Sequence, residues 1–223
     1  MEYIIPIVVV VVVVGICYYF LHKTTDSSTG YIIPKVEDGK KELQYHTKVK
    51  PSDNQPGGLQ FSYTAWLRID DFTYRYGSEK VIFVKGSGDL TTACPALVID
   101  ANTNTLLVKM DTFGAQETIS VVSVPSKKWL HIAIVVNQEA LNVYINGIMY
   151  AHHALTQLPR QNSGSLLVSP AGGFAGKIVL LEYQPIALTA GDVQKLAAQM
   201  PPISSEKGAQ VLPPYFDFSW FKV

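Results

Sequence analysis

Residues 141–154 read LNVYINGIMYAHHA, and this stretch decides the fold class. Apolar residues stand on both sides of the dipeptide Asn146-Gly147, which is the strongest short-range signal for a β-hairpin. A two-residue type I′ turn needs a positive φ at both central residues, and Asn and Gly tolerate that conformation. We therefore predict two antiparallel strands, 141–145 and 148–154, joined by this turn.

Further short strands are predicted on both sides of this hairpin, at intervals of about 8–12 residues. Residues 59–69 alternate apolar side chains with polar or outward-facing ones, and residues 129–136 are apolar on both faces, as in a central strand. Almost no helical period interrupts them. This pattern predicts an all-β, antiparallel jelly-roll sandwich. The remaining predicted strands are 42–50, 80–84, 96–100, 105–111, 118–124, 165–169 and 176–184.

One helix is predicted near the end of this region, over residues 189–199. Thr189 is a suitable N-cap, and Asp192 stands at the third helical position, which completes a capping box. Val193, Leu196 and Ala197 fall on one face of this helix.

Five segments stand in a fixed order within residues 59–200: 61–67 (FSYTAWL), 129–133 (WLHIA), 143–147 (VYING), 174–178 (FAGKI) and 188–196 (LTAGDVQKL). In sequence and order they resemble the landmarks of the concanavalin A-like, laminin-G-like jelly rolls. The resemblance implies two packed antiparallel sheets. The same family includes lectins, enzymes, adhesion modules and structural proteins, so the resemblance implies no single function.

The composition fits one globular domain with appendages. The chain has 223 residues, of which 48% are hydrophobic and 16% charged, and its 18 basic side chains balance 18 acidic ones. The hydrophobic content excludes a disordered protein. The absence of a basic excess disfavours nucleic acid as a partner, because phosphate binding needs a positive field.

Residues 1–22 are predicted to be a transmembrane anchor. Residues 4–21 contain no charged side chain, and as a helix they would be about 27 Å long, close to the thickness of the bilayer core. A cleaved signal peptide is the alternative, but Glu2 stands where a basic region is expected and no small-x-small cleavage site follows. The residues assigned to the anchor include Ile4, Val8, Val14, Tyr18, Tyr19 and Leu21.

Charge asymmetry predicts that the domain lies on the cytoplasmic side of a single-pass membrane protein. Lys23, Lys35, Lys40 and Lys41 follow the anchor, whereas Glu2 precedes it. The chain has only two cysteines and no Asn-x-Ser/Thr glycosylation site, which also favours a reducing compartment. We divide the rest into a tether and first strand segment (23–58), the jelly roll (59–200) and a Pro/aromatic tail (201–223).

The sequence predicts no enzyme, no catalytic residue and no cofactor. Glycosidases need two carboxyl groups about 5.5 Å or more apart across the scissile bond. Asp70 and Asp71 are adjacent and would point to opposite faces of a strand, and Glu182 has no neighbouring carboxylate.

No metal site is predicted either. Asp100, Asn102 and Asn104 could offer three oxygens to calcium, but Asp and Asn are also common turn residues, and calcium requires six or more ligands. His152 and His153 should point to opposite faces of their strand, and we expect His131 to be a hydrogen-bonded structural residue.

Two aromatic segments are predicted to bind a partner. Tyr74, Arg75 and Tyr76 lie in a loop between strands, and Tyr and Arg are favoured contact residues, although packing against the sandwich edge is the alternative. The second segment is the apolar C-terminal tail, which either packs on its own domain or binds another protein. Its candidate contact residues are Phe216, Phe218, Trp220 and Phe221.

These features favour a structural protein that links a lipid bilayer to a protein assembly. The design resembles that of membrane-anchored minor capsid proteins of large icosahedral DNA viruses, in which an internal virion membrane lies beneath a protein shell. The alternative is a membrane-anchored lectin, which would use Tyr74, Tyr76, Asp100 and Asn102 to bind a glycan.

Overall fold

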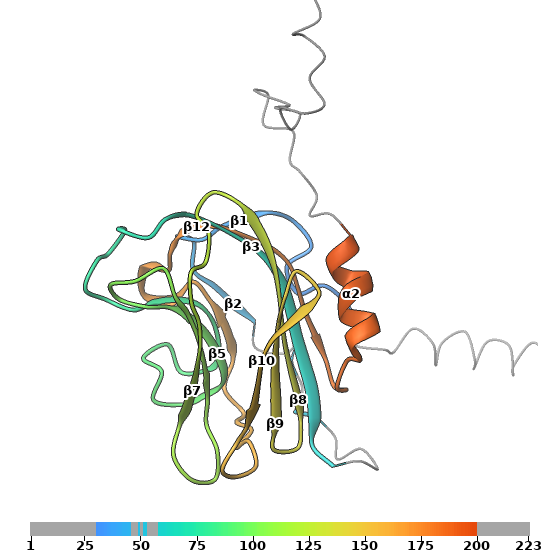
Figure 1. Ribbon diagram of the computed structural model, residues 1–223. Coiled ribbons are helices and arrows are strands. Elements are labelled where there is room, and N and C mark those ends of the chain that lie inside the picture. The colour runs from blue at the N-terminus through green and yellow to red at the C-terminus, as the bar shows by residue number, and fades with distance from the viewer. Residues whose placement is uncertain (1–29, 46–48, 50, 53–57, 200–223) are drawn as a thin grey trace, which may run out of the picture.

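The computed structural model describes residues 30–45, 49, 51–52 and 58–199, and it confirms an antiparallel two-sheet sandwich (Figure 1). One sheet has the strand order β1-β12-β3-β8-β9-β10, and the other has the order β2-β11-β4-β5-β6-β7. The strands are β1 (Glu37–Asp38), β2 (Leu43–Tyr45), β3 (Gln60–Asp71), β4 (Lys80–Gly86), β5 (Ala93–Ile99), β6 (Leu106–Met110), β7 (Glu117–Val121), β8 (Trp129–Asn137), β9 (Ala140–Ile145), β10 (Ile148–Ala154), β11 (Leu166–Val168) and β12 (Ala175–Gln184); a 3₁₀ turn, η1 (Pro170–Gly172), precedes β12, and the helix α2 (Ala190–Ala198) follows it.

The local turn and cap signals are confirmed. Asn146 and Gly147 have φ angles of 50° and 82°, and they join β9 to β10 as the type I′ turn requires. Thr189 caps α2, because its hydroxyl accepts a hydrogen bond from the backbone N–H of Asp192 while the Asp192 carboxylate accepts one from the Thr189 backbone. Residues close together in the sequence therefore specify both the β9–β10 turn and the start of α2.

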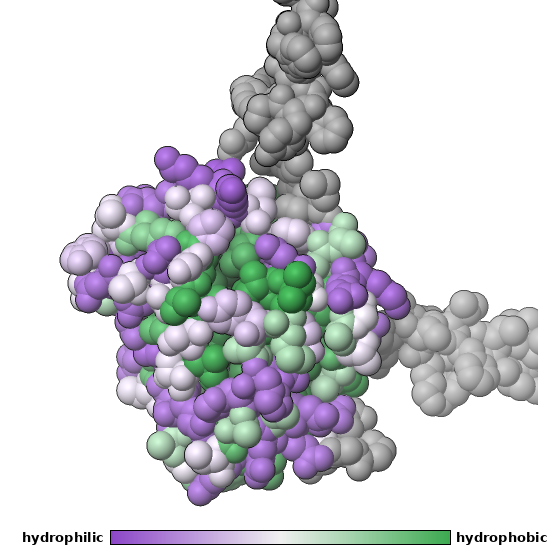
Figure 2. Space-filling view, in the orientation of Figure 1, coloured by the Kyte–Doolittle hydropathy of each residue, from purple (hydrophilic) through white to green (hydrophobic). Residues whose placement is uncertain are grey.

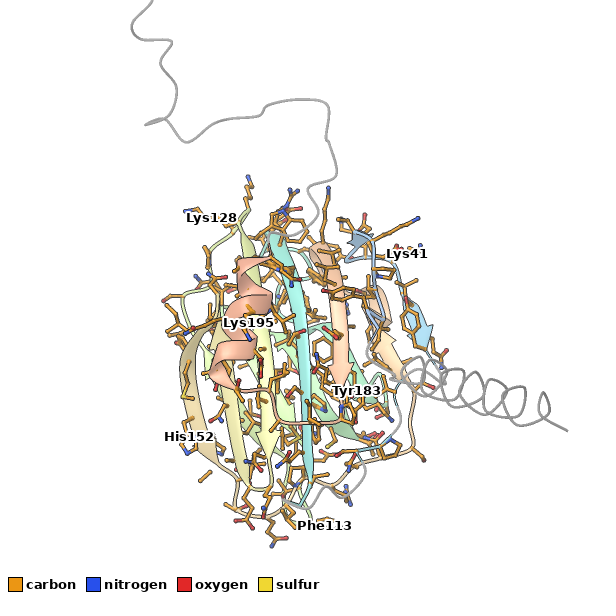
Figure 3. The ribbon with its side chains drawn as sticks, turned by 90° about the vertical axis from the view of Figure 1, so that its right-hand side faces the viewer. Lys41, Phe113, Lys128, His152, Tyr183 and Lys195 are labelled. Carbon is orange, nitrogen blue, oxygen red and sulfur yellow. The ribbon has the colours of Figure 1, made fainter. Side chains whose placement is uncertain are left out.

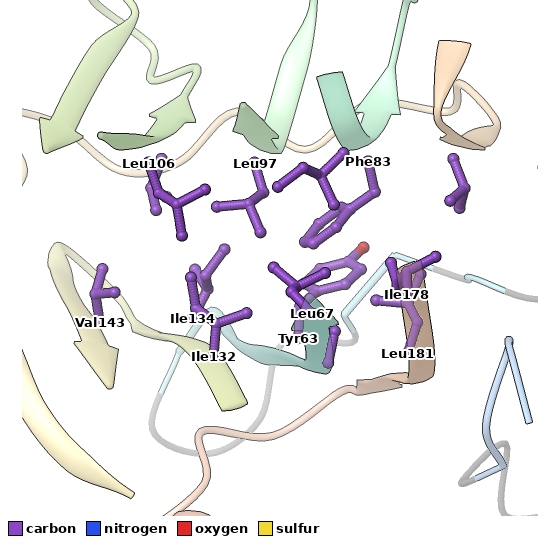
Figure 4. Close-up of a cluster of buried hydrophobic side chains, with 14 of the residues drawn as sticks. Tyr63, Leu67, Phe83, Leu97, Leu106, Ile132, Ile134, Val143, Ile178 and Leu181 are labelled. Carbon is purple, nitrogen blue, oxygen red and sulfur yellow. The ribbon is translucent and has the colours of Figure 1, made fainter. Parts of the chain in front are cut away.

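The core lies between the two sheets (Figure 4). Tyr63 and Leu67 of β3 face Phe83 of β4 across this layer, and the rings of Tyr63 and Phe83 stack with centroids 5.7 Å apart. Burial of these aliphatic and aromatic side chains is the main force that holds the sheets together.

The outer face of β3, which carries the polar or outward-facing residues of the predicted alternation, is buried. The Ser62 hydroxyl donates a hydrogen bond to the Ile186 carbonyl (2.7 Å) and accepts one from the Leu188 N–H (3.0 Å), so the segment before α2 lies across β3. The helix itself covers the outer side of β8 and β9, as Figure 3 shows (Lys195 lies on this helix). The alternation predicts which way these residues point, and the covering segments determine that this face is buried.

The described part of the segment 23–58 joins both sheets. β1 pairs with β12, whereas β2 pairs with β11 in the opposite sheet, and the strand predicted at 42–50 is described only as β2. Ile32 and Ile33 are buried, and their backbone N–H groups donate to the Leu181 carbonyl.

The predicted anchor (1–22) and aromatic tail (201–223) lie outside the described residues. Within the described part of the chain, no helix is long and apolar enough to span a membrane.

Candidate functional site

The loop between β3 and β4 is held by hydrogen bonds at both of its ends. At the start, one carboxylate oxygen of Asp71 accepts from the backbone N–H and the hydroxyl of Thr73, both at 2.7 Å, and these bonds lower the pKa of Asp71. At the end, the buried Lys80 ammonium donates to the Ala101 carbonyl at 3.1 Å. The bond ties the start of β4 to the segment after β5, and burial lowers the pKa of Lys80.

Tyr74 and Arg75 attach this loop to the η1 turn. The Tyr74 hydroxyl donates to the Gly172 carbonyl at 3.0 Å, and the Arg75 guanidinium donates to the Ala171 carbonyl. The Lys40 ammonium lies over the Tyr74 ring, 4.6 Å from its centroid. Three segments that are distant in sequence therefore meet at one end of the sandwich.

Tyr76 projects from this loop, and 69% of its surface is exposed. Its neighbours Tyr74 and Arg75 are restrained by the contacts to η1, so the loop presents Tyr76 from a fixed base. Of the three predicted contact residues, Tyr74 is half-buried and mainly structural, whereas Arg75 and Tyr76 face solvent. We call Lys40, Arg75 and Tyr76 the loop surface.

Lys40 was not predicted as a member of this surface. It stands far from Tyr74 in the sequence, and no local pattern indicates that the segment after β1 approaches the β3–β4 loop. Ala171 and Gly172 were likewise missed, because the sequence suggests only a turn there.

Asp100, Asn102 and Asn104 form a turn and no cation site is seen in the described part of the chain. One carboxylate oxygen of Asp100 accepts from the backbone N–H groups of Asn102 (3.0 Å) and Thr103 (2.8 Å), which lowers the pKa of Asp100. The Asn104 amide donates to the Val124 carbonyl at 3.3 Å. The turn therefore uses the side chains of Asp100 and Asn104 and the backbone N–H of Asn102.

The other carboxylates singled out in the sequence lie apart. Asp70 forms an ion pair with Arg68 at 2.8 Å, whereas Asp71 is bonded to Thr73. Glu182 is buried beside Gln184, and its pKa is raised because burial disfavours the charged form. No carboxylate pair that could flank a glycosidic bond is formed by these described residues.

The histidines have separate structural contacts. His152 contacts the Asn142 side chain (2.6 Å) and His153 contacts Glu117 (2.7 Å), so the two rings diverge as predicted. The buried His131 packs edge-on against Trp66, with ring centroids 5.3 Å apart. Its position in the core agrees with a structural role, although the Nδ1 atom of the ring has no hydrogen-bond partner among the described residues.

Cys94 lies in the core beside Met110, and burial raises the pKa of its thiol to about 12. The cavity next to it, lined in part by Tyr63, Lys85 and Tyr183, has a volume of about 10 Å³. That space holds a single water molecule and no larger ligand.

The comparisons with known proteins agree with this architecture. A family profile, described as the Concanavalin A-like lectin/glucanases superfamily, matches residues 43–194. The chain belongs to this superfamily. Its members share the two-sheet jelly roll described above, and the matched residues contain most of the described strands and most of α2.

Solved structures of low sequence identity share the fold of this superfamily member. The binding domain of botulinum neurotoxin serotype G is 17% identical with a TM-score of 0.53, and the alignment covers 76% of this chain and 47% of that one. The binding domain of serotype D is 10% identical with a TM-score of 0.54, covering 74% and 41%. The chain thus spans less than half the length of either domain. Comparison of the sequence with curated proteins gives no match.

Proposed function

We propose that this superfamily member is a non-enzymatic interaction protein whose loop surface binds a protein partner. The observation that supports this function best is the restraint of Tyr74 and Arg75 by η1, which holds the exposed Tyr76 in place. A contact residue that is already ordered loses less conformational entropy on binding. Tyr and Arg are also enriched among the residues that contribute most to protein interfaces.

In this proposal, the segment 1–22 anchors the domain on the cytoplasmic side of a membrane, and the domain links that membrane to a protein shell. The shell we propose is the capsid of a large icosahedral DNA virus with an internal membrane, where the chain serves as a minor capsid protein. The uncharged run at 4–21 and the lysines after it support the anchored arrangement. No cofactor takes part.

A membrane-anchored lectin is the second candidate, because Tyr76 also offers an exposed ring on which a sugar can stack. The Asp100 carboxylate, which a calcium-dependent lectin would use, already serves the turn at 100–104. This favours the protein partner over the glycan.

Tyr76→Ala is expected to weaken partner binding about thirtyfold, because an aromatic residue at the centre of an interface contributes about 2 kcal/mol. The measurement replaces Tyr76 with a photo-crosslinking residue in the full-length protein, in its native membrane, and identifies adducts by mass spectrometry. We expect adducts with a shell protein at position 76.

Phe113 provides a matched control, since it is also 69% exposed and lies at the opposite end of the domain from Lys41, the neighbour of Lys40 (Figure 3). Equal crosslinking at 76 and 113, or at neither, would contradict the proposal. Glycan-array binding that Tyr76→Ala abolishes would favour the lectin.

Cys94 is expected to resist thiol reagents in the folded protein, because a buried thiol with a pKa of about 12 forms almost no thiolate at pH 7. A maleimide should therefore label it only after denaturation. Because Cys94 does not react, a cysteine introduced at the exposed position 126 (Ser126→Cys, with Cys17→Ser) can be labelled selectively. Its labelling shows on which side of the membrane the domain lies. Labelling of Ser126→Cys by an impermeant reagent from the cytoplasmic face supports the proposed orientation, and labelling only from the opposite face would contradict it.

A further inference from the structure

The four sheet edges of the sandwich differ in how they are protected. β1 has two residues and both are acidic, β2 has three residues, and β7 carries Glu117. β10 is the longest edge strand, and its sequence IMYAHHA contains no Asp, Glu, Lys, Arg or Pro. Charges, prolines and short length are the usual features that prevent edge strands from pairing with other strands. β10 lacks all three.

An exposed apolar patch lies at this edge. Ile148, Met149 and Tyr150 of β10 are 72%, 47% and 44% exposed, and Val122, just after β7, is 55% exposed. The Tyr150 hydroxyl accepts a hydrogen bond from the Val122 N–H at 3.1 Å, which connects the edges of the two sheets. Ile148 pairs with Ile145, which packs against the core, whereas Met149 pairs with Tyr144, which packs under α2. Exposed apolar side chains therefore flank the β10 edge on both faces of its sheet. Figure 2 views this side of the molecule and shows hydrophobic side chains gathered near its centre.

The outer side of β10 also offers backbone groups. Among the described strands β10 pairs only with β9, and in an antiparallel ladder half of the N–H and C=O groups of an edge strand point away from its neighbour. A bulge between Met149 and Ala151 interrupts the register, and pairing is regular again from Ala151 to Ala154. This regular part, AHHA, contains no Asp, Glu, Lys or Arg, and its His153 is bonded to Glu117 of β7 in the other sheet (2.7 Å). No other described strand pairs with it.

The absence of Asp, Glu, Lys and Arg from β10 allows this strand to pair with the same strand of a second copy of the chain. In a two-fold pair each strand faces the same sequence, so a charged edge strand would oppose its own charge, whereas β10 brings no formal charge to the contact. The apolar patch of one copy would also come next to that of the other. We propose that two copies of this chain pair antiparallel along β10, about a two-fold axis near Ala151 and His152, so that their sheets become continuous. This interface is separate from the loop surface.

The test measures the mass of the full-length protein in detergent micelles by light scattering after gel filtration. We expect a dimer for the native sequence and for Ile186→Lys, and at least a tenfold increase in the dissociation constant for the double variant Ile148→Lys/Met149→Lys. Ile186 is a matched control, because it is 45% exposed and lies outside the patch, after β12. Unchanged melting curves would show that the variants fold.

Cysteine crosslinking locates the axis. In a Cys17→Ser background, Ala151→Cys or His152→Cys should form an intermolecular disulfide under mild oxidation, whereas Ser126→Cys should not. A native monomer at about 100 μM, where even a weak specific dimer would form, would overturn the proposal, as would a dimer that the β10 double variant leaves intact. A monomer whose β10 amides are protected from hydrogen exchange would also overturn it and would assign the edge to another occupant, such as the residues after Gln199.

Discussion

Phe174→Ala is expected to lower the free energy of unfolding by about 3–5 kcal/mol, the largest effect of any substitution considered for this domain. The Phe174 ring is completely buried between two backbone segments. A methyl group added to Gly39 would come within 2.8 Å of this ring, and one added to Gly176 within 2.7 Å. The ring therefore fills a slot beside two glycines, whose lack of side chains leaves the space that the ring occupies.

Urea unfolding followed by tryptophan fluorescence measures this effect, with Phe113→Ala as the control for loss of an exposed ring. The control should change stability by no more than about 0.5 kcal/mol. Because the Phe174 N–H also donates to the Gly39 carbonyl at 2.9 Å, the ring supports the segment that carries Lys40 of the loop surface. A loss below about 1 kcal/mol for Phe174→Ala would show that the slot collapses and that this packing argument is wrong.

His131 is expected to make the stability of the domain fall by about 3 kcal/mol between pH 6.5 and pH 4. Burial lowers the pKa of His131 from 6.5 to about 4. In this window the unfolded chain binds a proton at this position and the folded chain does not, so acid favours unfolding. The stabilisation is complete above pH 6.5 and is lost as the pH falls toward 4.

His131→Phe removes the titrating group while keeping an aromatic ring against Trp66. The difference between the unfolding free energies of the native and variant proteins, measured at several pH values, isolates this contribution from that of the carboxylates. Glu182 acts in the opposite direction, because its raised pKa favours the folded state at low pH. A pH dependence that His131→Phe leaves unchanged would mean that the ring accepts its proton in the folded state.

The sequence predicted the parts of the fold that depend on neighbouring residues. Asn146-Gly147 specified the β9–β10 turn through its backbone conformations, and Thr189 with Asp192 specified the start of α2 through reciprocal hydrogen bonds. The five landmark segments indicated the jelly roll, which the family profile confirmed. For the candidate site, the sequence identified the loop at 74–76, although it did not show that Tyr74 is largely structural while Tyr76 is exposed.

The sequence specified most of the strands, although not β1, together with the turn and helix signals and the residue types available for function, because each follows from local conformational preference and spacing. The three-dimensional structure was needed to show that α2 covers β8 and β9 while the segment before it lies across β3, and that Tyr74 and Arg75 bond to residues 98 and 96 positions away. It also showed that, among the described strands, β10 is at the edge of its sheet. The physical reason is that such contacts depend on chain topology and on mutual burial of surfaces. No short segment carries that information.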